Sequence, residues 1–121
     1  MRNISREYEK EATIVLYECA KFPKDFKEMI EILNNIAELA NVRIVSYCEH
    51  QHSNGAKSLA AIVEESNINL SEWLEYNTFI VRISSCNPNS NFEKVKSYLE
   101  KRLECKESKI DERKVQLYLN K

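Results

Sequence analysis

The residues best suited to chemistry in this sequence are a pair of histidines and a glutamate–serine pair. His50 and His52 form an H-x-H pair at the end of a predicted strand, where alternation would place both rings on one face and could hold a metal ion. Glu49 between them would point the other way and no third ligand is evident, so we expect turn-adjacent or partly buried histidines and no metal. Glu65 and Ser66 end a buried-looking strand, and taken alone they indicate a charged strand edge that runs into a turn.

Other motifs with a known chemical mechanism are absent from the sequence. There is no phosphate-binding glycine loop, no H-E-x-x-H segment and no G-x-S-x-G segment. The four cysteines, Cys19, Cys48, Cys86 and Cys105, form no C-x-x-C pair, which argues against a zinc ribbon or a redox motif. From spacing alone we expect each of them to be buried as a small hydrophobic side chain.

Length and composition narrow the class of protein. With 121 residues, 43% of them hydrophobic, the chain predicts a single domain over residues 1–121. Eighteen Lys and Arg residues against nineteen Asp and Glu residues give a net charge of -1, which argues against a general nucleic-acid binder. No apolar run is long enough for a membrane helix, and the charged N-terminus lacks the apolar region of a signal peptide. We expect a soluble cytoplasmic protein.

Hydrophobic spacing predicts two helices. Apolar residues three and four apart predict an amphipathic helix over residues 22–40, with Asp25 near its start. A second helix is predicted over residues 92–103, with Ser90 or Asn91 as its N-cap.

Strand signals give a β-α-β-β-β-α-β order. The segment 67–77 is ambiguous, because Ser71 could cap a short helical turn through Trp73 and Glu75. This order predicts an α+β, two-layer sandwich: an antiparallel sheet with both helices on one face. The open face of such a sheet is a place for an oligomer interface or a ligand site. The predicted strands cover residues 12–19, 42–47, 59–63, 78–84 and 115–119.

A wider set of residues resembles the small prokaryotic S-adenosylmethionine decarboxylases, which make their own pyruvoyl cofactor. The family carries an F/L-Y-x-C strand end, matched here by residues 16–19, and an H-x-F-like segment, matched by residues 50–52. Its central signature is a serine, an apolar strand and then E-S-H-I-x-I-H-T-W-P-E-Y, where this chain has Ser58 and then residues 65–76. Ten residues past that tyrosine the family has a catalytic cysteine, and Cys86 stands there.

The resemblance implies a proenzyme that cleaves itself between Glu65 and Ser66. The Ser66 hydroxyl would attack the preceding carbonyl to give an ester, and elimination and hydrolysis would leave a pyruvoyl group at the new chain start. That group would form a Schiff base with the substrate amine and act as an electron sink during loss of CO2. Cys86 would then donate a proton, Glu75 would contact the ribose, and an aromatic wall would hold the adenine and the sulfonium.

The departures from the family pattern bear on this chemistry. Ser71 stands where the family has its processing histidine, and a serine hydroxyl is a poor base for the elimination step. Asn67 stands in place of the histidine that follows the cleavage serine, and Leu74 stands in place of the W-P-E proline. Near the catalytic cysteine, Arg82 replaces an acidic residue of the preceding strand, and Asn87 replaces the glycine that follows the cysteine. Three hypotheses therefore stay open: a cofactor-free lyase, a pyruvoyl-dependent decarboxylase, and a non-catalytic relative that binds S-adenosylmethionine or an active partner.

The cofactor-free lyase is the preferred hypothesis from sequence, because the missing histidine is a specific chemical defect. In this reaction the carboxylate of S-adenosylmethionine, or of a derivative, displaces the sulfonium internally and gives methylthioadenosine and homoserine lactone. No cofactor is then expected, whereas the decarboxylase would use a pyruvoyl from Ser66. Either reaction predicts a small-molecule substrate and a homo-oligomer with interface active sites, with no membrane or nucleic-acid partner. The candidate catalytic residues are Ser66, Glu65, Cys86 and Glu75, and the candidate substrate-binding residues are Tyr76, Trp73, Ser58, Tyr47 and Tyr17.

Overall fold

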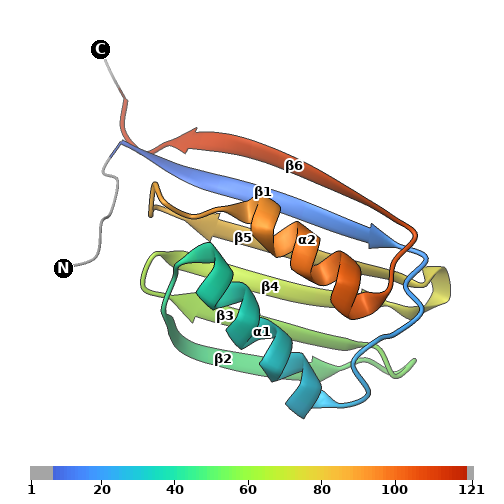
Figure 1. Cartoon of the computed structure of the whole chain (residues 1–121). Helices are drawn as coiled ribbons and strands as arrows, with labels where there is room; N and C mark the ends of the chain where they lie inside the picture. Colours follow the sequence, from blue (N-terminus) through green and yellow to red (C-terminus); the bar gives the residue numbers. More distant parts are fainter. Residues whose placement is uncertain (1–6, 120–121) are drawn as a thin grey trace.

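The computed structural model describes residues 7–119, which form one antiparallel sheet covered by two helices on one face (Figure 1). The six strands lie in the order β2-β3-β4-β5-β1-β6, and every neighbouring pair is antiparallel. The predicted α+β two-layer sandwich is therefore confirmed. Along the chain the elements are β1 (Tyr8–Tyr17), α1 (Phe26–Ala40), β2 (Ile44–Gln51), β3 (Lys57–Val63), β4 (Ser66–Trp73), a 3-10 turn η1 (Leu74–Tyr76), β5 (Thr78–Ser85), α2 (Phe92–Leu103) and β6 (Glu107–Gln116).

The helices form where the apolar spacing predicts them. Asp25 caps α1 by accepting a hydrogen bond from the Glu28 backbone N–H, and Asn91 caps α2 in the same way from Lys94. The first helix begins at Phe26, later than predicted, because Asp25 is its N-cap and adopts an extended backbone. Both helices bury an apolar stripe against the sheet, and none of the described helices is long and apolar enough to cross a membrane.

The ambiguous segment is a central strand, so the predicted element order was one strand short. Residues 66–73 form β4, which pairs with β3 on one side and β5 on the other. Ser71 lies within this strand and caps no helix; the short turn begins at Leu74, and its preceding residue Trp73 makes no side-chain cap bond. The alternation of Ile68, Leu70 and Glu72 toward the helices was hard to recognise because the third buried position carries a charge.

The last strand was also misplaced by the sequence pattern. The prediction put it at residues 115–119, whereas β6 spans Glu107–Gln116 and pairs with β1 along its whole length. This strand is highly charged, so its position is set by backbone pairing and by contacts such as the Arg113–Glu11 ion pair, in which Nε lies 2.7 Å from Oε1. The first two strands are likewise shifted from their predicted positions: β1 spans residues 8–17 and not 12–19, and β2 spans residues 44–51 and not 42–47.

The face of the sheet away from the helices, which we call the open face, carries most of the polar side chains of the central strands. Alternation sends Leu59, Ile68 and Leu70 into the core, so their neighbours along each strand point the other way. Cross-strand pairing aligns His50, Ser58 and Ser71 in one row of this face. The open-face positions include Ser46, Cys48, His50, Ser58, Ala60, Ile62, Asn67, Asn69, Ser71, Ile80, Arg82 and Ser84.

Truncation of Leu70 tests the assignment of β4. Leu70 is 1% exposed in the core, whereas Val45 on the edge strand β2 is 58% exposed. We expect Leu70→Ala to lower the free energy of unfolding by about 2–5 kcal/mol, because it leaves a cavity, and Val45→Ala to change it by less than about 0.5 kcal/mol. Urea unfolding of both variants measures the difference; equal small effects would contradict a buried central strand.

Candidate functional site

The Glu65–Ser66 peptide lies in the tight turn between β3 and β4 and is held from three directions. The Glu65 carbonyl oxygen accepts a hydrogen bond from the Cys86 backbone N–H at 3.0 Å. The Glu65 side chain is only 1% exposed, and its Oε1 accepts a hydrogen bond from the Arg43 backbone N–H at 3.0 Å. The Glu64 backbone N–H donates to the Arg43 carbonyl oxygen at 2.8 Å. The turn is therefore fixed to the start of β2 and to the end of β5.

The Ser66 hydroxyl lies next to the carbonyl carbon that it could attack. Asn67 Nδ2 donates a hydrogen bond to Ser66 Oγ at 3.1 Å, which restricts the hydroxyl, and Ser66 pairs with Ser85 in the sheet register. Attack of Oγ on the Glu65 carbonyl would place negative charge on the carbonyl oxygen. The Cys86 N–H already points at that oxygen, so it is a preorganised donor for an oxyanion. This predicted group, Glu65, Ser66 and Cys86, is brought together by the structure.

The Cys86 thiol is partly buried at the same place. Burial raises its pKa above the ordinary thiol value, and the Glu9 carboxylate adds to the increase, while its own backbone N–H acts in the opposite direction. The thiol form therefore persists at neutral pH. Cys86 is suited to donate a proton rather than to act as a thiolate nucleophile.

Asn87, which stands where the resemblance has a glycine, anchors the loop after β5. Its Nδ2 donates to the Asn41 carbonyl oxygen at 2.8 Å, and its backbone N–H donates to Ser85 Oγ at 3.0 Å. Ser85 and Ser90 share a further hydroxyl–hydroxyl hydrogen bond of 2.8 Å. These bonds are buried and hold Cys86 in register with the Glu65 carbonyl.

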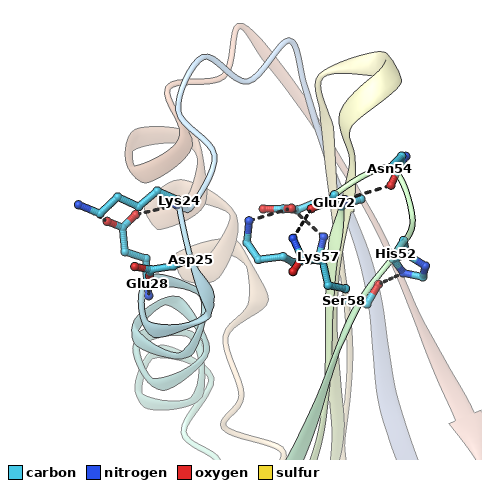
Figure 2. Close-up of polar contacts among 11 residues, drawn as sticks. Lys24, Asp25, Glu28, His52, Asn54, Lys57, Ser58 and Glu72 are labelled. Carbon is cyan, nitrogen blue, oxygen red and sulfur yellow. Dashed lines mark hydrogen bonds and ion pairs between the residues drawn. The ribbon is translucent and has the colours of Figure 1, made fainter.

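A second group of polar residues surrounds a cleft of about 480 Å³ at the other end of β4, which we call the His52 cleft. His52 Nε2 lies 2.8 Å from Ser58 Oγ (Figure 2). The 52–56 turn permits this contact, because Gly55 adopts a φ of 90° that favours glycine and its N–H donates to the His52 carbonyl oxygen at 2.9 Å. The cleft is lined by His52, Ser53, Asn54, Ala56, Ser58, Ser71, Glu72, Trp73 and Glu75.

The two histidines do not form the one-faced pair that a continuous strand would give. β2 ends at Gln51, so the alternation stops before His52, and the His50 and His52 rings meet edge-on with centroids 4.7 Å apart. Among residues 7–119, no three His, Cys, Asp or Glu side chains are grouped closely enough to hold a metal ion. From the sequence, His50 and His52 were considered as a metal pair; the His52–Ser58 contact could not be predicted because a turn creates it.

A buried ion pair lies behind the His52 cleft, on the side of the sheet that faces the helices (Figure 2). Lys57 Nζ lies 3.3 Å from Glu72 Oε1, which also accepts a hydrogen bond from the Lys57 backbone N–H at 2.8 Å. Glu72 Oε2 is buried and has no hydrogen-bond partner among residues 7–119. This pair fixes the ends of β3 and β4 relative to each other, and the sequence analysis gave it no role.

The structure divides the predicted substrate-binding residues among three regions. Ser58, Trp73 and Glu75 line the His52 cleft, and Tyr76, next to Glu75, is 70% exposed. Tyr47 lines another hollow of about 450 Å³, the Asn67 cleft, which also includes Ser46, Cys48, Ala60, Ala61, Ile62, Asn67 and Asn69. Tyr17 is partly buried at the end of β1, with Lys109 Nζ 5.8 Å from its ring centroid.

The two ends of the open face are too far apart to meet within one chain. Ser66 and Ser71 lie on the same extended strand, and five residues at about 3.3 Å each separate them by roughly 16 Å. Ser66 borders the Asn67 cleft, whereas Ser58 and Glu75 lie in the His52 cleft. The candidate site residues therefore lie in two separate regions of each chain.

The four cysteines differ in burial, which corrects the expectation that all would be buried. Cys19 is buried, Cys86 and Cys105 are partly buried, and Cys48 is exposed on the edge strand β2. Burial, together with the neighbouring Cys105, raises the pKa of Cys19 to about 12.

Comparison of the sequence with known proteins identifies a family, and comparison of the structure identifies a solved structure with the same fold. A family model described as S-adenosylmethionine decarboxylase matches residues 10–115. An S-adenosylmethionine decarboxylase proenzyme from Saccharolobus islandicus is 31% identical over 98 residues, or 80% of each chain, and one from Sulfurisphaera tokodaii is 33% identical over the same share. The crystal structure of the adenosylmethionine decarboxylase from Aquifex aeolicus shares the fold, with a TM-score of 0.78 at 16% identity, covering 97% of this chain and 98% of that one.

The raised pKa of Cys86 predicts slow alkylation at neutral pH. Exposed Cys48 is the internal reference, and we expect iodoacetamide to label Cys86 more slowly than Cys48 because only the thiolate reacts. Labelling of Cys86 should accelerate as the pH rises above the ordinary thiol range, measured by peptide mass mapping. Labelling of Cys86 at least as fast as Cys48 near neutral pH would contradict a protonated thiol.

Proposed function

The chain belongs to the S-adenosylmethionine decarboxylase family, and from this premise we propose that it is a self-processing, pyruvoyl-dependent decarboxylase of S-adenosylmethionine. The observation that carries the proposal is the hydrogen bond of 3.0 Å from the Cys86 N–H to the Glu65 carbonyl, beside the Ser66 hydroxyl. The relatives' names support both parts of it, since they are called S-adenosylmethionine decarboxylase proenzymes.

Self-processing uses groups that this chain holds around the Glu65–Ser66 peptide. Ser66 Oγ adds to the Glu65 carbonyl carbon, the Cys86 N–H stabilises the resulting oxyanion, and the C–N bond then breaks to give an ester and a free Ser66 amine. Loss of the Ser66 Cα proton expels the Glu65 carboxylate and leaves an enamine, which becomes an imine. Water converts this imine to a pyruvoyl group and ammonia.

The residues in these two regions of the site suit the substrate. A pyruvoyl group formed from Ser66 would supply an electron sink for loss of CO2, and the protonated Cys86 thiol could return a proton. The exposed faces of Trp73 and Tyr76 can contact the positively charged sulfonium, and the Glu75 carboxylate can accept hydrogen bonds from ribose hydroxyls.

A second copy of the chain would join the two regions of the site. A two-fold axis through the open face would bring the His52 cleft of one copy toward the Ser66 end of the other, which no contact within one chain achieves. Ile62 is 56% exposed on this face and would be covered by the partner. The functional unit is thus a homodimer with two composite sites.

The cofactor-free lyase remains a second candidate because of one observation. Ser71 faces the His52 cleft where the resemblance has a histidine, and its hydroxyl is a poor base. If processing fails, the same clefts could hold S-adenosylmethionine while its own carboxylate displaces the sulfonium. The family membership favours the decarboxylase, and a product assay separates the two.

Cleavage between Glu65 and Ser66 is the first prediction of this function. Purified, denatured wild-type protein should show two masses, one ending at Glu65 and one beginning with a pyruvoyl in place of Ser66. Ser66→Ala should give a single uncut mass because no hydroxyl is left to attack the carbonyl. Ser84→Ala, which removes a hydroxyl from the neighbouring strand β5, is the matched control and should be cut like the wild type. An uncut wild-type chain would contradict the proposal.

The products then identify the reaction. Carboxyl-labelled S-adenosylmethionine should release labelled CO2 with the processed wild type and none with Ser66→Ala, where the electron sink is missing. Methylthioadenosine without CO2, from an uncut chain, would support the cofactor-free lyase instead. Neither product from either protein would leave only the non-catalytic hypothesis.

A charge in the middle of the open face tests the homodimer. We expect Ile62→Asp to shift the protein from dimer to monomer in analytical ultracentrifugation, because an unpaired carboxylate would be buried at the interface. Asn34→Asp adds the same charge to the exposed surface of α1 and should leave the dimer intact. A wild-type monomer, or an equal effect of both variants, would contradict dimerisation through this face.

A further inference from the structure

We propose that His52, oriented by Ser58, is the base that removes the Ser66 Cα proton of a second copy during self-processing. This inference rests on the proposed function. It assigns the proton-transfer step, for which Ser71 is unsuited, to a histidine that lies in the same cleft.

The contact between His52 and Ser58 is what singles out this ring. Nε2 lies 2.8 Å from Ser58 Oγ, and Ser58 is the direct cross-strand partner of Ser71. When Nε2–H donates to Ser58 Oγ, the lone pair of the neutral ring is on Nδ1, which makes no hydrogen bond to any residue between 7 and 119. The result is an oriented imidazole whose base nitrogen is free, in a cleft large enough for a peptide segment or a small molecule.

His52 is exposed, so the ring is accessible to a partner chain. A neutral imidazole is a far stronger base than a serine hydroxyl. His50 is the only other histidine, and its ring touches that of His52 edge-on, but no hydrogen bond to Ser58 orients it. This difference makes His50 the natural control.

The geometry requires that His52 act on another chain. Ser58 and Ser71 form one cross-strand pair, and Ser66 lies five residues from Ser71, roughly 16 Å along the same strand. His52 lies beyond Ser58 in the turn after β2, so it cannot reach Ser66 of its own chain. The two-fold arrangement of open faces described above brings it to Ser66 of the partner copy.

The proposed step balances without any added reactant. After the ester has formed, Nδ1 of His52 takes the Cα proton of the partner copy's Ser66, the C–H electron pair forms the Cα–Cβ double bond, and the Cβ–Oγ bond breaks. The leaving group is the Glu65 carboxylate at the end of the released segment. The imidazolium returns its proton to Cβ as the enamine becomes the imine, and the ring is neutral again.

The variant His52→Ala should stall after ester formation, a result that a merely structural residue would not give. We expect wild type and His50→Ala to process fully, while His52→Ala is cut at least tenfold more slowly and accumulates a chain of unchanged mass. Hydroxylamine should then split that chain at Glu65–Ser66 and leave an intact Ser66 amine at the new start, because it attacks an ester and not an amide. His52→Gln, which keeps a hydrogen bond to Ser58 but cannot take the proton, should behave like His52→Ala.

Mixed dimers test whether the base comes from the other chain. When Ser66→Ala and His52→Ala chains of distinguishable mass are co-expressed, the His52→Ala chain should be cut, because its own Ser66 faces the intact His52 of its partner. Wild-type chains paired with the double variant His52→Ala/Ser66→Ala should remain uncut. The opposite pattern would overturn the inference. If the wild-type chain is cut in the second pair and the His52→Ala chain is uncut in the first, His52 acts within its own chain.

The controls separate this inference from the proposed function. An uncut wild-type chain would contradict the decarboxylase itself. Processing of His52→Ala at the wild-type rate, in a protein that cleaves at Glu65–Ser66, would overturn only the role of His52. Loss of cleavage in His52→Ala with no hydroxylamine-sensitive ester would also overturn it, because the elimination step would then not be the one affected.

Discussion

The hydrogen bond from the Cys86 N–H to the Glu65 carbonyl is the constraint on which the rest of the site depends. It joins the turn between β3 and β4 to the end of β5, two segments that are neighbours only in the folded sheet. The buried Glu65 side chain adds a second attachment, at the Arg43 backbone N–H. Because the carbonyl and the side chain of Glu65 are both held, the carbonyl that Ser66 could attack and its oxyanion donor, the Cys86 N–H, are fixed together before any substrate arrives.

The one-sided covering of the sheet decides where this chemistry can occur. Both helices pack on one face, so the core takes alternate residues of every central strand and the others are left on the open face. On β4 this places Asn67, Asn69 and Ser71 along one exposed row. This row separates the His52 cleft from the Ser66 end of the sheet. A second copy of the chain is therefore needed for both the function and the base that we propose.

Two residues that depart from the family pattern make hydrogen bonds of their own near the Glu65–Ser66 peptide. Asn87, in the position of a glycine, donates a side-chain hydrogen bond from the loop after β5 to the Asn41 carbonyl oxygen at the end of α1. Asn67, in the position of a histidine, donates to Ser66 Oγ. Only the presence of Ser71 in place of a histidine removes a group that could act as a base. The histidine that could replace it is His52, which is hydrogen-bonded to Ser58.

Local signals in the sequence determined the elements whose residues interact with close neighbours in the chain. The period of α1, the caps Asp25 and Asn91, and the apolar strands β3 and β5 could all be predicted, because spacing and capping act over a few residues. The resemblance also identified Glu65, Ser66 and Cys86 as a set.

Tertiary structure alone decided what depends on distant partners. β4 is a strand although Glu72 occupies a buried position, because Lys57 on the neighbouring strand neutralises it. β6 is a strand because β1 supplies its backbone partners, despite a charged sequence with little apolar alternation. The contact of His52 with Ser58 exists because a turn reverses the chain between them, and the division of the site into two halves follows from strand length. None of these is encoded in local spacing, since each depends on backbone pairing, ion pairing or chain reversal that forms only when the sheet does.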